Sequence, residues 1–160
     1  MHDPDILARI DALQTNYLRA LDGRDMAGWL DCFADKDGSY ICTTRENEEQ
    51  GLPLALMMDD CYERLQDRVR FITEVWSGTY EDYQTRHFVQ RLDCSHKGAG
   101  IYAVASNFMV SYTSPRGQSE ILAAGIYRDE VSLAGNDAKF KSKRAILDTV
   151  ATPRYLVYPV

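Results

Sequence analysis

Histidine is scarce in this sequence: only His2, His87 and His96 occur in 160 residues. A mononuclear iron site built from two histidines and one carboxylate needs two ordered imidazoles. A Rieske cluster needs two more, together with paired cysteines. Three histidines cannot supply both sites, and no HExxH motif or closely spaced Cys/His pair indicates zinc. We therefore expect this chain to hold no metal and no other cofactor by itself.

Cysteine is also sparse, and its spacing shows no pairing. Cys32, Cys42, Cys61 and Cys94 lie 10, 19 and 33 residues apart, and none forms a CxxC pair. This pattern is typical of buried free thiols in a reducing compartment. The polar, acidic start of the chain does not resemble a secretory signal, and no run of 18 apolar residues is available to span a membrane. We expect a cytoplasmic protein without a membrane segment.

The chain has no surplus of basic residues. Lys and Arg number 18 and Asp and Glu number 24, so the net charge is −6. Such a chain is poorly suited to replace phosphate counterions, and we expect no nucleic-acid partner. No P-loop, GxGxxG motif or serine nucleophile elbow is present, and the cluster Gly98-Ala99-Gly100 is interpreted as a hairpin turn.

The N-terminal half has helical periodicity, and its first helix is predicted to carry one apolar stripe of Ile6, Ile10, Leu13, Tyr17 and Leu21. Asp3 and Pro4 suit the cap and first turn of a helix that ends near Gly23, and Asp25 suits the cap of a second helix. A third helix is predicted from about residue 53 to residue 71, where apolar residues keep to one side. A short strand is predicted over residues 39–44. We therefore assign a helical part to about residues 3–72 of a single domain that spans residues 1–160.

The C-terminal half alternates in the manner of strands. Residues 84–93, 100–113, 120–131 and 139–150 predict a four-strand antiparallel meander within a sheet part of about residues 83–150, followed by an apolar tail over 151–160. Ala123, Ala124 and Gly125 are small enough for a bend or a close backbone approach. The predicted fold class is α+β: three N-terminal helices packed on a strongly curved antiparallel sheet, forming a cone whose outer face is half apolar. An exposed apolar sheet face indicates an interaction surface.

The interior of such a cone is a common place for small-molecule chemistry. An acid or base held there with a shifted pKa would suit a stand-alone isomerase, cyclase or dehydratase that acts on a small hydrophobic substrate. The candidate pocket residues are Asp37, Tyr40 and His87, with Asp129 and Asp148 on later strands. A third hypothesis is that the chain is a small-molecule binding module of the same fold.

The strands and tail also carry side chains that favour protein interfaces. Arg86, Arg128 and Arg144 lie within strands, and arginine suits interface ion pairs. The chain has ten tyrosines, of which Tyr155 and Tyr158 lie in the apolar tail, and tyrosine supplies contact area at low entropy cost. We take these five residues as candidate subunit contacts.

Several segments resemble the small (beta) subunits of aromatic-ring-hydroxylating dioxygenases, which share the NTF2-like (SnoaL-like) cone. The resemblance occurs in the family's order at residues 29–33, 44–47, 67–69, 76, 85–87, 104–108, 124–129 and 143–148. Val-x-Ser-Asn-Phe, Ala-Gly-x-x-x-Asp and Arg-x-x-Leu-Asp are its most specific parts. His87 replaces a position that is often basic, and residues 77–82 replace a segment that is often proline-rich. Trp76, a matching position, joins the candidate contacts.

The resemblance implies a non-catalytic, structural subunit of an oxidoreductase for aromatic compound degradation. In such enzymes the Rieske [2Fe-2S] cluster and the mononuclear Fe(II) belong to the large alpha subunit, and NADH supplies electrons through a reductase. The implied assembly is an α3β3 hexamer in which the small subunits self-associate as a trimer. The pattern resembles anthranilate-, salicylate- or benzoate-type systems.

Overall fold

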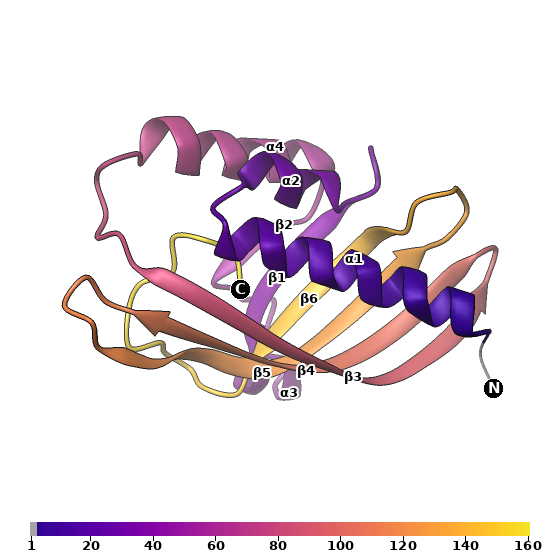
Figure 1. Cartoon of the computed structure of the whole chain (residues 1–160). Helices are drawn as coiled ribbons and strands as arrows, with labels where there is room; N and C mark the ends of the chain where they lie inside the picture. The colour runs from indigo at the N-terminus through magenta and orange to yellow at the C-terminus, as the bar shows by residue number, and fades with distance from the viewer. Residues whose placement is uncertain (1–2) are drawn as a thin grey trace.

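A computed structural model describes residues 3–160 and shows a curved six-stranded sheet wrapped around one long helix (Figure 1). The elements, in chain order, are α1 Pro4–Asp22, α2 Met26–Asp31, β1 Ser39–Thr44, α3 Arg45–Glu49, β2 Met57–Asp59, α4 Tyr62–Arg70, the π-helical turn η1 Phe71–Val75, β3 Gln84–Gly98, β4 Ile101–Thr113, β5 Ser119–Ser132 and β6 Lys139–Leu147. The α+β cone predicted from the sequence is confirmed.

Helix α1 lies in the concave face of the sheet (Figure 1). The Asp3 side chain accepts a hydrogen bond from the Asp5 backbone N–H, and Pro4 occupies the first helical position. The predicted apolar stripe is buried. The expected left-handed residue after this helix is Arg24 (φ 60°) rather than Gly23, which is helical at φ −89°. Asp25 caps α2 as predicted, because its carboxylate accepts from Gly28 N at 2.8 Å.

The sheet order is β2-β1-β6-β5-β4-β3. Strands β3 to β6 form the predicted antiparallel meander, and the turn at residues 98–100 joins β3 to β4. The expectation of a purely antiparallel sheet is wrong, because β1 pairs with β6 in parallel. This pairing brings the N-terminal part of the chain onto the edge of the meander and closes the narrow end of the cone.

The predicted helix over residues 53–71 is wrong in its first half. Residues 57–59 form the edge strand β2, in which Met57 pairs with Cys42 and is buried. The helix begins only at Tyr62 and continues as a π-helical turn to Val75. Pairing with β1 satisfies backbone groups at the sheet edge, and this tertiary contact outweighs the helical spacing of the apolar residues.

Bulges bend the long strands. Register shifts occur twice between β3 and β4, once between β4 and β5, and once between β5 and β6. Each bulge adds local twist, and together they curve the sheet around α1. Gly125 sits in β5 where a Cβ atom would come within 1.9 Å of the Ile146 carbonyl oxygen. The predicted close backbone approach in this strand is therefore confirmed.

The four cysteines form no disulfide bond within residues 3–160; Cys32, Cys42 and Cys94 are buried, whereas Cys61 is partly exposed. Burial raises the pKa of the Cys42 thiol to about 12 and that of Cys32 to about 11. These thiols are core residues with little thiolate character. Within residues 3–160, no helix has the length and apolar character needed to cross a membrane.

Replacing Gly125 with Val should destabilise the fold by about 3 kcal/mol or more, because the added side chain must displace the β6 backbone. Urea denaturation of the isolated chain measures the effect. The matched control is Ala124→Val in the same strand, whose side chain lies on the other face of the sheet. Equal stability of the two variants would contradict the close approach.

Candidate functional site

The interior of the cone is filled with aromatic side chains from α1, α2 and the sheet. Tyr17 packs edge-to-face on Tyr127 and Phe140, with ring centroids 6.3 and 5.6 Å apart, and Trp29 packs on Tyr40 at 5.9 Å. All five side chains are fully buried. The volume in which the sequence predicts a pocket is therefore occupied by the protein's own core.

The tail completes this filling. Val157 and Val160 are buried, and the chain ends beside α1 and β1 (Figure 1). The hydroxyls of Tyr17 and Tyr40 both donate to the Val160 oxygen, at 2.9 and 3.1 Å, and Val160 N–H donates to the Tyr40 oxygen at 3.0 Å. Segment 151–160 thus packs back into its own domain.

The structure does not bring the three pocket candidates together. Asp37 lies exposed in the turn before β1, and Tyr40 is buried against Val160. His87 lies on the inner face of β3, where its Nδ1 is 2.6 Å from Asp22 Oδ1. The His87 side chain is only 2% exposed. Of the later candidates, Asp148 lies at the surface in an ion pair with Arg45.

Asp22 joins the end of α1 to the edge strand β3. Its carboxylate accepts hydrogen bonds from Thr85 Oγ1 at 3.0 Å and from His87 N at 3.1 Å, besides its contact with the imidazole. Burial alone would raise the pKa of Asp22, but the hydrogen bonds and charge of His87 outweigh it and lower the pKa below 3.8. Asp22 was not identified from the sequence, because 65 residues separate it from His87.

The other buried polar cluster was also missed. Lys143 and Asp129 face each other across β6 and β5, with Nζ 3.0 Å from Oδ2, and both side chains are fully buried. Gln14 Nε2 donates to the same carboxylate at 2.7 Å. The ammonium also lies 3.7 Å from the Tyr127 ring centroid.

Desolvation dominates the electrostatics of this pair. It raises the pKa of Asp129 and lowers that of Lys143, while their mutual attraction acts in the opposite sense on each. Asp129 appeared among the sequence candidates, but its partner did not. Finding Lys143 requires the β5–β6 register, which a bulge shifts between Glu130 and Val131.

The candidate contact arginines lie on the sheet face opposite α1. Arg86 and Arg128 are exposed, and Arg144 is half-buried in an ion pair with Glu48. Arg128 and Arg144 are direct cross-strand partners. Exposed apolar residues share the long strands with them, at Phe88 and Leu92. The expected half-apolar outer face is therefore present.

Trp76 lies at the end of η1 and is 38% exposed. Its ring packs on Phe71 at 5.7 Å, and both line a hollow of about 260 Å³ together with Arg64 and Arg68. Arg68 is held by a bidentate contact with Asp59, at 2.6 and 2.9 Å. A rigid cation beside two exposed aromatic rings is typical of protein-binding surfaces.

Tyr155 and Tyr158 have different surroundings. Tyr155 is exposed and accepts a hydrogen bond from Glu81 N at 3.1 Å. Tyr158 bonds to the Tyr80 hydroxyl at 2.7 Å, and the Arg24 guanidinium covers its ring at 4.0 Å. Tyr158 therefore anchors the tail within its own domain.

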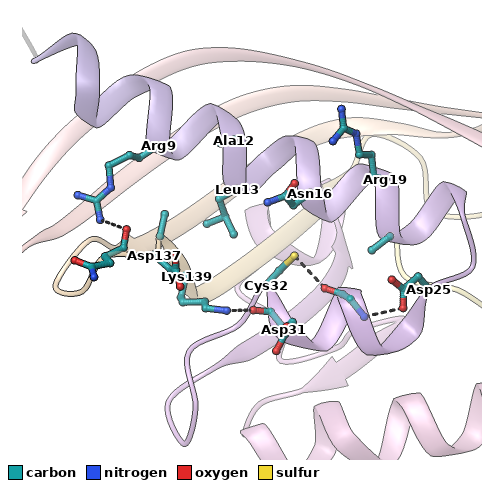
Figure 2. A pocket seen from close by; sticks show the side chains of 14 residues that line it. Arg9, Ala12, Leu13, Asn16, Arg19, Asp25, Asp31, Cys32, Asp137 and Lys139 are labelled. Carbon is teal, nitrogen blue, oxygen red and sulfur yellow. Dashed lines mark hydrogen bonds between the residues drawn. The ribbon is translucent and has the colours of Figure 1, made fainter.

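A surface groove of about 510 Å³ runs between α1, α2 and the β5–β6 connection (Figure 2). Arg9 donates to the carbonyls of Gly135 and Asn136 at 2.7 and 3.1 Å, and Lys139 donates to the Asp31 carbonyl. Basic and acidic side chains alternate along the groove. It contains none of the residues predicted for a pocket.

Residues 3–160 contain no group of three or more His, Cys, Asp or Glu side chains placed to hold a metal ion. His87 is bound to Asp22, whereas His96 is exposed near the far end of β3 and packs on Tyr102. His2 lies outside the described residues. These side chains do not fit an iron centre.

The family model for the ring hydroxylating beta subunit matches residues 18–153. The chain belongs to this family, the small subunits of ring-hydroxylating dioxygenases.

Individual relatives are similar over nearly the whole chain. The chain is 29% identical over 148 residues to the anthranilate 1,2-dioxygenase small subunit of Burkholderia cepacia, covering 92% of this chain and 90% of that protein. It is 27% identical to a terephthalate 1,2-dioxygenase beta subunit of a Comamonas species, covering 95% and 97%. Among solved structures, a protein of Novosphingobium aromaticivorans assigned as such a beta subunit superposes with a TM-score of 0.82 at 27% identity, covering 94% and 93%.

Removing one member of the buried ion pair should cost far more than removing both. Lys143→Met leaves Asp129 buried without its counter-ion and should destabilise the fold by about 3–5 kcal/mol, as should Asp129→Leu. The double variant should recover a large part of this loss. Urea denaturation of the four proteins gives the coupling energy. Additive single effects would show that the pair is not coupled.

The contact of Asp22 with His87 should depend on pH. Folding lowers the pKa of Asp22, so its carboxylate stabilises the folded state at a pH above 3.8. This contribution is lost as the pH falls through the lower pKa of the folded state. The stability difference between wild type and Asp22→Asn should therefore shrink between about pH 5 and about pH 2. His87→Gln should weaken this dependence. A constant difference across the range would contradict the contact.

Proposed function

We propose that this chain is the non-catalytic small subunit of a multicomponent Rieske non-haem iron dioxygenase that hydroxylates aromatic rings. Its role is to assemble the oxygenase by self-association as a trimer and by contact with three large subunits in an α3β3 hexamer. The family match supports the class of enzyme. The named relatives support an aromatic carboxylate such as anthranilate or terephthalate as the substrate of the complex.

The outer sheet face carries this proposal. Like charges opposite each other across strands are unfavourable, yet Arg128 faces Arg144 there. Glu48 compensates Arg144, but no ion pair within residues 3–160 compensates Arg128. A carboxylate from a neighbouring subunit would complete the arrangement, and the exposed Phe88 and Leu92 on the long strands would be covered at the same time.

Trp76 and Tyr155 provide further candidate contacts away from the sheet face. Trp76 offers a partly exposed ring beside Arg68, which is typical of an interface anchor. Arg86 extends the arginine set to the start of the edge strand β3. Tyr158 acts indirectly in this proposal, because it fixes the tail on which Tyr155 is presented.

The redox chemistry belongs to the partner in this proposal. The Rieske [2Fe-2S] cluster and Fe(II) are held by the large subunit, and NADH electrons arrive through a reductase. The complex acts in the cytoplasm, where the free, buried thiols of this chain stay reduced.

The alternative of a stand-alone isomerase, cyclase or dehydratase receives no support from the geometry of its candidates. Acid–base catalysis requires a group within hydrogen-bonding reach of a substrate. Asp37 is remote from the interior, while Tyr40 and His87 are enclosed by the protein.

Co-expression with a large subunit carrying CxH and CxxH cluster motifs tests the proposal. The purified complex should contain both chains in equal amounts, and iron should stay with the large chain after separation. Phe88→Asp/Arg128→Glu on the outer face should reduce the recovered hexamer by about tenfold or more, since about 1.4 kcal/mol is a factor of ten in association. Size-exclusion chromatography with light scattering measures assembly.

The matched control is Arg19→Glu, an exposed arginine on α1 with the same charge reversal. It should assemble as wild type does. Iron retained by the small chain alone would overturn the division of roles, and unchanged assembly of the double variant would remove the sheet face from the interface.

A further inference from the structure

Two tyrosine hydroxyls inside the cone form a binding site for one oxygen atom of Val160. Tyr17 and Tyr40 come from α1 and β1, and both donate to the same Val160 oxygen. Burial raises the pKa of both phenols well above 10, so they remain protonated donors at neutral pH. Two convergent donors in an apolar interior are characteristic of a site that binds a carbonyl or carboxylate group.

Aromatic rings surround this oxygen-binding site. Trp29 packs on Tyr40, and Phe33 packs on Tyr17 at 6.4 Å. The space beside these rings is occupied by two small isopropyl groups, those of Val157 and Val160. A molecule that replaces them would have a compact apolar body and one acceptor oxygen.

Two of the buried polar atoms that lack a hydrogen-bond partner within residues 3–160 belong to side chains on the inner face of the sheet. The Tyr127 hydroxyl is fully buried and makes no hydrogen bond within residues 3–160, although its ring packs on Tyr17. His87 Nε2 is likewise buried and unpaired, while Asp22 fixes its ring through Nδ1. Unpaired buried polar atoms are costly, and they point to a ligand group that the tail does not supply.

The tail is attached in a way that permits release. Residues 148–160 form no helix or strand, so their departure breaks no sheet pairing. Outside the cone the tail is held by side-chain contacts, chiefly Tyr158 with Tyr80 and Arg154 with Glu81.

We propose that segment 156–160 occupies a binding site for a small apolar carboxylate or amide, and that its withdrawal opens this site. Tyr17 and Tyr40 bind the ligand oxygen, and Tyr40 also accepts from an amide N–H as it does from Val160. Tyr127 and His87 supply additional hydrogen-bonding groups. This site lies inside the cone, away from the contacts on the outer sheet face, although its opening breaks the Tyr158 contact that fixes Tyr155.

The test expels the tail from the full-length chain. Val157→Asp/Val160→Asp places two carboxylates where burial is unfavourable, so the tail should leave the interior. Val150→Asp is the matched control, because Val150 precedes the tail and is 63% exposed. The probes are sodium 3-methylbutanoate, benzamide and toluene, which lacks an acceptor oxygen. Binding is followed by saturation-transfer NMR and by the thermal midpoint.

The double variant should bind 3-methylbutanoate and benzamide saturably at about millimolar concentration or below, with a rising thermal midpoint. Wild type and Val150→Asp should show neither effect. Adding Tyr17→Phe and Tyr40→Phe should weaken these two probes by about tenfold, as expected for two hydrogen bonds, and leave toluene unchanged. A peptide of residues 154–160 should displace the probes.

A folded double variant that binds none of the probes would overturn the proposal, as would binding that is indifferent to the tyrosine replacements. If the double variant is unfolded, the single variant Val160→Asp in the full-length chain provides the second test. Saturable binding of 3-methylbutanoate with a rising thermal midpoint supports the site, and a folded single variant that binds none of the probes contradicts it. Assembly with the large subunit is measured separately, so failure here leaves the proposed function standing.

Discussion

A strongly curved sheet encloses a volume that has to be filled. Here the filling comes from three distant parts of the chain: Tyr17 on α1, Trp29 on α2 and Val160 in the tail. Their contacts are mutually dependent, because the hydroxyls of Tyr17 and Tyr40 both donate to the Val160 oxygen. The constraint also explains the aromatic composition, since large rings fill a wide cone with few residues. The rest of the architecture follows from this interior.

The buried Lys143–Asp129 pair shows how the sheet is held in one register. A one-residue slip of β6 against β5 would turn Lys143 to the outer face and leave Asp129 without a counter-ion in the core. Replacement of such pairs by apolar residues is often neutral for stability, so stability alone does not account for its presence. Specification of the β5–β6 register, next to a bulge, is the property that the geometry favours. The same register places Arg128 opposite Arg144 on the other face.

The sequence predicted the elements whose signals are local. Capping by Asp3 and Asp25, the stripe on α1, the turn at residues 98–100 and the alternation of the four long strands were confirmed. The predictions that failed share one cause: the structure at those residues depends on contacts with distant parts of the chain. Residues 53–61 carry helical spacing, but pairing with β1 makes part of them a strand. Asp22 with His87, and Lys143 with Asp129, become visible only when the fold aligns residues far apart in the chain. His87 was among the candidate pocket residues, but the periodicity of the sequence could not show its contact with Asp22 or its burial.

The inner and outer faces of the same strands have separate tasks. On β5, Tyr127 and Asp129 point into the cone, whereas Arg128 between them points out. Substitutions on the outer face can therefore alter partner contacts without disturbing the filled interior. Substitutions in the interior affect partner contacts only by changing the shape of the sheet. This separation suits a structural subunit, which needs a rigid body and an adaptable surface. A protein of this shape can therefore keep an interior site closed by its own tail while its function depends on the outer sheet face. Nothing in the proposed assembly requires the tail to leave.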